Sequence, residues 1–326
     1  MQFTNDEMRY FSMLFEEVSP ESIFKRYREP LDDTELYRIK AQLASKQLFS
    51  ATEDSHQGTL ERPVDGMMVV LNILAFPSRS SHFSLQYPEG KLYKAVYASD
   101  QQRILLEFLD TDVVISIYDT EAASVRQEIS NQTGVSFQKV STFKSALSKD
   151  ELTILLSVID ILRLRRIKTL LPLVSIPHAD GQAQEDAQLI HLDELQTVLH
   201  APAPSGIVAT LKTSLGLEAI DLQSSQVSLS TLVESGFFDK QSTFNQGIYV
   251  NPVLHRLAQH FLLADVLIRL ELTQMPYVSR ELILQGSLKQ ALAISTTDSA
   301  YEIESLTGIE ILNRIDGYLS CPILSE

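Results

Sequence analysis

The stretch MQFTNDEM (residues 1–8) opens the chain, and a similar stretch, QLIHLDEL (188–195), appears past its middle. In this alignment the two acidic pairs coincide, and an apolar residue, Phe3 or Ile190, stands three places before each of them. An internal duplication predicts that the same offset persists further along the chain. An internal repeat constrains the whole fold, because both copies must then form the same unit.

The offset does persist. Three further pairs of segments match at nearly the same value: ASKQLFS (44–50) with VESGFFD (233–239), RPVDGMM (62–68) with NPVLHRL (251–257), and DTDVVIS (110–116) with TDSAYEI (297–303). The sequence therefore predicts two copies of one unit, 1–130 and 188–326, joined by a central helical connection with a polar linker at 131–187. Two copies are too few for a solenoid, so we expect a pseudo-symmetric pair.

The composition is that of a folded, acidic protein. The chain has 326 residues, of which 44% are hydrophobic, and this is enough for two cores or one shared core. Its 27 basic and 42 acidic side chains leave a net charge of -15. Such a charge opposes broad electrostatic binding to nucleic acid or to anionic membranes. The lone Cys321 excludes an intramolecular disulfide and any site with several cysteine ligands.

The sequence also predicts the cellular compartment of the protein. The first residues carry Asp6 and Glu7 where a signal peptide needs a basic segment and an apolar core. The most apolar stretch, 151–171, is interrupted by Asp160 and Arg163 before it reaches the ~18 to 20 apolar residues of a membrane span. We therefore expect a cytoplasmic protein without a membrane span, whose long apolar helix is buried nearly all round or partly committed to a partner.

Each copy reads as helices followed by four strands. The period-two segments are 82–87, 92–98, 103–108 and 113–117 in the first copy, and 266–272, 281–285, 290–295 and 301–305 in the second. Short polar connections predict antiparallel neighbours. The expected fold class is α+β, with two pseudo-symmetric repeats that each contain helices and a four-stranded antiparallel meander. The two meanders can join edge to edge into one sheet, which would cover an exposed strand.

Local signals for chemistry are missing from the sequence. It contains no GxxxxGK, GxGxxG, HExxH or GxSxG pattern, so no catalytic, cofactor-binding or metal site is predicted. His178 and Asp180 form a chance pair in the polar linker, whereas Thr4 and Glu7 are spaced as a capping box. The basic run RLRRIK (163–168) is expected to be a solvated edge of the long helix or a source of ion pairs within the fold.

The order of these segments suggests a relative. The series LASKQLF, MMVVLNILAFP, HFSLQY, KLYKAVYA and RILLEFLDTDVVIS, with its echo LVESGFF, NPVLHRLAQHFLLAD, VLIRLEL and ALAIS, resembles the EspG family of type VII (ESX) secretion-associated chaperones. The resemblance covers most of the chain as a pattern and includes no strict signature motif. It implies two pseudo-symmetric halves around a central sheet with helical bundles. It also implies a non-enzymatic cytoplasmic chaperone that binds a helical secretion substrate and keeps its aggregation-prone tip covered.

In that family, a loop between strands of the central sheet meets the partner together with neighbouring helical surface. The matching segment here is PSRSSHFSLQYPEGK (77–91), and the resemblance implies partner contacts at Phe83, Tyr87 and Lys91. The alternative is an ordinary hairpin, with Phe83 and Tyr87 on one face of a strand.

Two other classes of protein stay open at the level of sequence. An enzyme or small-ligand-binding protein would need polar or titratable side chains in a pocket between the two copies. A winged-helix-type regulator would need a basic face assembled from residues distant in sequence. The sequence leaves the partner's identity and the oligomeric state open.

Overall fold

The computed structural model describes residues 1–52, 60–88, 90–134, 144–170, 189–204, 206–239, 247–261, 264–286, 291–297 and 300–324. The elements up to residue 133 are β1 (Gln2–Thr4), α1 (Asn5–Met13), η1 (Ile23–Tyr27), α2 (Asp33–Ser45), β2 (Phe49–Thr52), β3 (Leu60–Pro63), α3 (Asp65–Ala75), β4 (Arg79–Tyr87), β5 (Gly90–Ala98), β6 (Arg103–Phe108), β7 (Asp112–Ile117) and α4 (Tyr118–Thr133).

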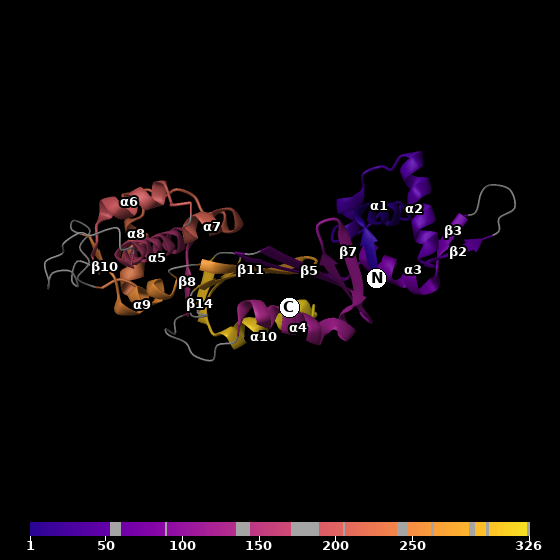
Figure 1. Ribbon diagram of the computed structural model, residues 1–326. Helices are drawn as coiled ribbons and strands as arrows, with labels where there is room; N and C mark the ends of the chain where they lie inside the picture. The colour runs from indigo at the N-terminus through magenta and orange to yellow at the C-terminus, as the bar shows by residue number, and fades with distance from the viewer. Residues whose placement is uncertain are drawn as a thin grey trace. The chain divides into compact units, whose positions relative to one another are not determined.

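The later elements repeat the same general order. They are β8 (Lys144–Leu147), α5 (Lys149–Leu170), β9 (Leu189–Ile190), α6 (Leu192–His200), α7 (Ile207–Leu215), α8 (Gln226–Glu234), β10 (Ile248–Tyr249), α9 (Pro252–His260), β11 (Ala264–Gln274), β12 (Tyr277–Gly286), β13 (Ala291–Thr296), β14 (Tyr301–Leu306) and α10 (Gly308–Leu319). Figure 1 shows the elements in chain order by colour.

One sheet of ten strands contains both predicted meanders. Its order is β1-β7-β6-β5-β4-β11-β12-β13-β14-β8. The first strands of the two meanders, β4 and β11, are neighbours, and one short strand closes each edge. The predicted α+β fold with two edge-joined antiparallel meanders is therefore confirmed.

The chain divides into two compact units. Unit 1 consists of Met1–Gln132, Ile268–Arg280 and Leu312–Glu326, and unit 2 of Thr133–Leu267 and Glu281–Ile311. Unit 1 thus takes segments from both predicted copies. The predicted domain boundaries at residues 130 and 187 come from the match between the two copies in the sequence. They stay a prediction.

The core of unit 1 lies between its helices and one face of β5, β6 and β7. Phe3, Phe11 and Phe24 are fully buried there, together with Tyr97 and Leu106 from the sheet. The rings of Phe3 and Phe11 meet edge to face, with centroids 5.1 Å apart. Because aromatic side chains bury the largest apolar areas, these contacts dominate the packing of the first helices.

The core of unit 2 surrounds the long helix α5. Side chains from Leu152 to Arg163 are buried on nearly every side, as predicted, and α5 contacts α6, α7, α8 and α9. A helix that is apolar all round can be stable in water only when neighbouring elements cover each of its faces. None of the described helices is both long and apolar enough to cross a membrane.

The strands at the two edges of the ten-stranded sheet, β1 and β8, are each followed directly by a helix. Strand β1 pairs with β7 through Phe3 and Val113, and β8 pairs with β14 through Leu147 and Tyr301. Each short strand runs directly into a helix with a capping box. Thr4 and Glu7 form the first box, and Ser148 and Glu151 form the second.

Residues 189–200, by contrast, contain β9 and α6, and both lie outside the ten-stranded sheet. Strand β9 pairs with β10, and the residue before α6, His191, makes no side-chain cap bond. Strands β1 and β8 thus lie at the two edges of the ten-stranded sheet, and β9 lies outside it. The predicted start of the second copy at residue 188 stays a prediction.

Candidate functional site

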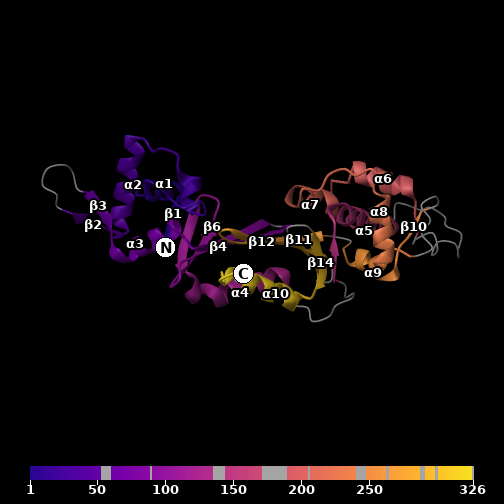
Figure 2. The ribbon, with the colours of Figure 1, turned by 180° about the vertical axis from the view of Figure 1, so that it is seen from behind.

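Strands β4 and β5 have one buried face and one exposed face. Phe83 and Leu85 on β4, and Lys94 and Val96 on β5, are at most 2% exposed. This face lies against α4, because Lys94 Nζ is 2.9 Å from Glu128 Oε2 on that helix. Figure 2 shows α4 and α10 on one side of these strands. Since successive side chains in a strand alternate, the residues between the buried ones point the other way.

That second side is the candidate site, and we call it the open face. It comprises His82, Ser84 and Gln86 of β4, Lys91 and Tyr93 of β5, Arg269 and Glu271 of β11, and Val278 and Arg280 of β12, with Arg26 of η1 beside Tyr93. Each of these side chains is partly or largely exposed, and all belong to unit 1. Strand pairing aligns Ser84 with Tyr93 and Gln86 with Lys91. An ion pair of 2.7 Å joins Glu271 on β11 to Arg280 on β12.

The three residues predicted as partner contacts do not lie together. Phe83 is 0% exposed and belongs to the core, so its side chain offers no surface to a partner. Tyr87 is on the same side of β4 as Phe83, and its ring covers the hairpin turn near Gly90. Lys91 is exposed on the open face. The sequence interpretation of an ordinary hairpin describes Phe83 correctly, while Lys91 and the turn at Tyr87 stay proposed contacts.

A chain of hydrogen bonds organises one end of the open face. Arg26 Nη2 donates to Tyr93 Oη at 3.1 Å, and Tyr93 Oη lies 2.9 Å from His82 Nδ1. Burial above all, together with the Arg26 charge, lowers the pKa of His82 to about 4, and Glu271 acts in the opposite direction. His82 is therefore neutral at pH 7. Its Nδ1 can accept the Tyr93 hydroxyl proton, because the Tyr93 oxygen already accepts from Arg26.

Aromatic contacts hold the same groups in place. The Arg26 guanidinium lies 5.6 Å from the centroid of the Tyr93 ring and 5.9 Å from that of Phe108. The His82 ring meets Tyr97 edge to face, with centroids 5.7 Å apart. Burial raises the pKa of Tyr97, so this phenol stays protonated. The arrangement presents a fixed cation, a neutral imidazole and an aromatic ring to whatever covers the strands.

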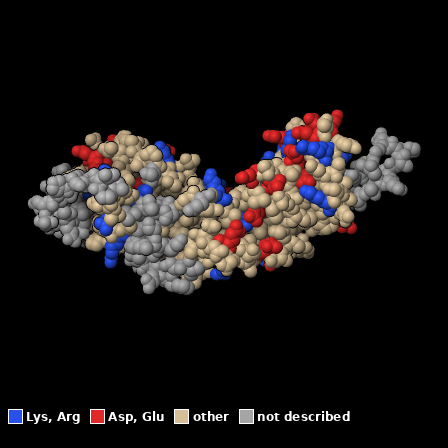
Figure 3. All heavy atoms as spheres, viewed as in Figure 1, with Lys and Arg blue, Asp and Glu red and all other residues tan. Residues whose placement is uncertain are grey.

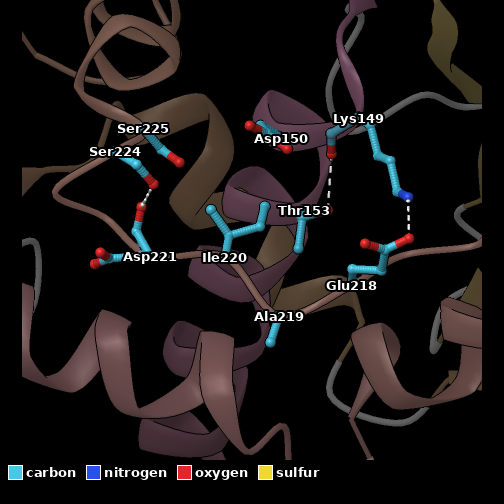
Figure 4. A pocket seen from close by; sticks show the side chains of 9 residues that line it. All are labelled: Lys149, Asp150, Thr153, Glu218, Ala219, Ile220, Asp221, Ser224 and Ser225. Carbon is cyan, nitrogen blue, oxygen red and sulfur yellow. Dashed lines mark hydrogen bonds and ion pairs between the residues drawn. The ribbon is translucent and has the colours of Figure 1, made fainter.

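A hollow of about 200 Å³ lies in unit 2, at the start of α5 (Figure 4). It is lined by Lys149, Asp150, Thr153, Glu218, Ala219, Ile220, Asp221, Ser224 and Ser225. Lys149 Nζ is 2.9 Å from Glu218 Oε1, and this hydrogen bond raises the pKa of Lys149 and lowers that of Glu218. Asp221 accepts from the Gln223 amide at 3.1 Å. These polar groups pair with each other and with the local backbone, which is typical of helix starts.

A second hollow, of about 260 Å³, lies beside β8 and is lined by Lys144, Ser145, Ser235, Gly236, Phe237, Asn251, Val253 and Leu254. Asn251 is engaged there as the cap of α9, since its Oδ1 accepts from the Val253 amide at 2.8 Å. Within the described parts of the chain, no three side chains of histidine, cysteine, aspartate or glutamate come together as metal ligands.

The basic run 163–168 supplies ion pairs inside unit 2. Arg163 Nη1 is 2.7 Å from Asp160 Oδ1, and both side chains are buried. The Asp160 carboxylate also accepts from the amides of Ile207 and Val208 at the start of α7. Arg165 pairs with Glu194 on α6. The interpretation of this run as a source of ion pairs is confirmed for Arg163 and Arg165.

Lysine and arginine are dispersed on the face shown in Figure 3. There they lie among aspartate and glutamate, most visibly over the first helices, and form no continuous basic surface. A DNA-binding regulator presents a broad basic surface to phosphates, and this face shows none.

Comparison with known proteins gives distant likenesses to solved structures. No protein-family model matches the sequence, and no curated protein matches it either. A solved structure that resembles the chain is that of the type VII secretion system chaperone EspG5 of Mycobacterium tuberculosis, determined in complex with a PE25–PPE41 dimer. The two share 8% sequence identity, with 100% of this chain and 98% of that chain covered and a TM-score of 0.47. A likeness at this level is one of fold only.

Proposed function

We propose that this protein is a non-enzymatic chaperone or adaptor of the cytoplasm that binds a helical protein substrate of a secretion system on its open face. The observation that carries the proposal is the contrast between the two sides of β4 and β5. Phe83 and Leu85 are 0% exposed on one side, while Gln86 and Lys91 are exposed on the other. Strand faces in a folded core are normally covered, so an uncovered one indicates a surface for a partner.

The chemistry of the open face suits a protein partner. It combines an aromatic ring, a stacked arginine, amide and hydroxyl groups, and an apolar residue, Val278, at one end. Tyrosine and arginine are enriched at protein interfaces because each offers a large contact area together with hydrogen-bond donors. Such a surface can bind without catalytic groups. The sequence pattern that resembles the EspG family is a second, independent support.

Photo-crosslinking tests the proposal. The chain is expressed in its native host with p-benzoylphenylalanine in place of Gln86, which is exposed on β4 within the open face. After irradiation we expect a crosslink to a protein whose crosslinked segment is helical. The matched control places the same residue at Tyr37, which is 80% exposed on helix α2, outside the sheet.

A crosslink at position 86 that is absent at position 37 supports the proposal. If both positions give the same products, or position 86 gives none while the secretion substrates are being made, the open face is not a docking surface and the proposed function fails.

A further inference from the structure

We infer that the partner segment that docks on the open face is an acidic helix, one that carries an excess of carboxylates on its contacting side. The inference rests on the proposed function and specifies the chemistry of its partner. It depends on the balance of charge on the open face, which is opposite in sign to the balance of the whole chain.

The open face is a cationic island on an acidic protein. Its cations are Arg26, Lys91, Arg269 and Arg280, and Arg280 is paired with the one anion of the face, Glu271. The inference rests on the exposed Arg26 and Lys91. The chain as a whole has a net charge of -15. A local excess of one sign attracts a partner of the opposite sign and repels partners of the same sign, so this island selects for carboxylates.

The geometry of Arg26 strengthens the selection. Its guanidinium is held by the hydrogen bond to Tyr93 and by stacking on the Tyr93 and Phe108 rings. A guanidinium has several N–H donors in a planar fork, and the Tyr93 contact uses one of them. The fork is therefore oriented in advance for a bidentate bond to a carboxylate, which costs less entropy than ordering a free arginine.

Lys91 supplies a second anchor of a different kind. It is exposed and stands opposite Gln86 across β4 and β5. A lysine ammonium acts as a mobile point charge and tolerates variation in where the partner's acid lies. The neutral His82 between Arg26 and Glu271 adds no charge at pH 7, so the positive charge of the face comes from the arginines and this lysine.

The same charges argue against two other occupants. In a twofold dimer the same patch faces itself, so a second copy would place these cations against each other. A nucleic acid would offer phosphates to the island, but it would also approach a chain of net charge -15. An acidic helix can pair its carboxylates with these cations, and it avoids the repulsion between cations that a dimer would bring.

Two synthetic helical peptides of equal length and identical apolar stripe test the inference. One carries glutamate and the other lysine at every remaining exposed position. Binding of each to the full chain is measured by fluorescence anisotropy. We expect the glutamate peptide to bind at least about tenfold more tightly, which corresponds to ~1.4 kcal/mol. Its affinity should fall as NaCl rises from roughly 50 to 300 mM, because salt screens exposed charges.

Variants test whether the preference for the glutamate peptide comes from the open face. The double variant Lys91→Glu with Arg26→Gln should remove the preference for the glutamate peptide. The control Lys212→Glu changes the charge by the same sign at an exposed position on α7 in unit 2 and should leave the preference intact. A labelled single-stranded oligonucleotide serves as the third probe.

Each other outcome overturns the inference. Equal binding of the two peptides, tighter binding of the lysine peptide, or binding of neither at roughly 100 µM contradicts an acidic partner. Oligonucleotide binding as tight as that of the glutamate peptide, lost in the same double variant, would assign the island to nucleic acid. Failure of the proposed function is seen separately, in the crosslinking at position 86.

Discussion

Lys94 Nζ lies 2.9 Å from Glu128 Oε2, and this ion pair links the middle of strand β5 to helix α4 although the lysine side chain is only 2% exposed. Glu107 on the neighbouring strand lies 3.1 Å from the same nitrogen. A buried ammonium costs several kcal/mol unless it is paired, so two carboxylates around one lysine make α4 part of the sheet's cover. Cross-strand from Lys94 stands Phe83, so the residue first expected at a partner surface borders this buried cluster.

The Lys94 cluster predicts an asymmetry between two kinds of substitution. Replacing both Glu107 and Glu128 by glutamine leaves a buried ammonium without a carboxylate, and it should lower the free energy of unfolding by about 3–5 kcal/mol. Lys94→Met removes the charge and keeps the apolar stem, so it should cost clearly less. Urea unfolding of the three proteins measures the difference. A larger loss for Lys94→Met would show that the carboxylates do not stabilise the lysine.

His82 predicts a dependence of stability on pH. Its folded pKa is about 4, below its ordinary value of 6.5, so the unfolded chain binds a proton that the folded chain excludes between these two values. The contribution of His82 to stability is therefore fully present above pH 6.5 and is lost as the pH falls towards 4. NMR titration should place the His82 midpoint near pH 4. In His82→Gln, the slope of stability against pH between 4 and 6.5 should be smaller, and an unchanged slope would exclude His82 as its source.

The two capping boxes at the sheet edges predict matched losses. Thr4→Ala and Ser148→Ala each remove a side chain that accepts the amide three residues on, and each should cost about 1 kcal/mol. The sites belong to different units, so the double variant should show the sum within ~0.5 kcal/mol. Thr4→Ser and Ser148→Thr keep the hydroxyl and serve as controls. If only one alanine variant is destabilised, the capping boxes of α1 and α5 do not contribute equally to the free energy of unfolding.

Gly206 predicts a steric effect at the start of α7. A Cβ at this position would lie 2.7 Å from Asp160 Oδ2 and 2.8 Å from the Ala203 carbonyl oxygen. Gly206→Ala must therefore displace the carboxylate that caps α7, and we expect a loss of about 1–3 kcal/mol. Gly66→Ala is the matched control, because nothing lies within 4 Å of a Cβ there. Thermal unfolding should show a lower midpoint for the Gly206 variant than for the control.

Substitutions at Phe83 and Lys91 should have opposite effects on folding, although both residues were expected at the partner surface. Phe83→Asp would empty the space of a fully buried ring and bury a third carboxylate beside Lys94, which two carboxylates already pair, so the chain should fail to accumulate as folded protein. Lys91→Glu changes an exposed side chain and should shift the free energy of unfolding by less than about 0.5 kcal/mol. Circular dichroism and size-exclusion chromatography of the two variants check this. A folded Phe83→Asp protein would mean that Phe83 is accessible after all.

Sequence patterns were sufficient where the physical cause is local. The eight predicted strands of the two meanders and the capping box at Thr4 and Glu7 depend on neighbours a few residues apart. Some elements had no such signal. The short strands β2, β3 and β10 and the helix α7 lack a clear period, and their pairing and packing hold them in place.

The sequence by itself determined the elements and their order, because periodicity, capping and turn residues act over a few positions along the chain. Only the tertiary structure decided which side of β4 is covered, so that Phe83 lies in the core and Lys91 on the surface. It also decided that β1 and β8, which are far apart in the sequence, close the two edges of the ten-stranded sheet. Alternation defines two faces of a strand but does not say which one is buried, since that depends on contacts with segments far away in sequence. For the same reason, the open face was found only once β11 and β12 were placed beside β4.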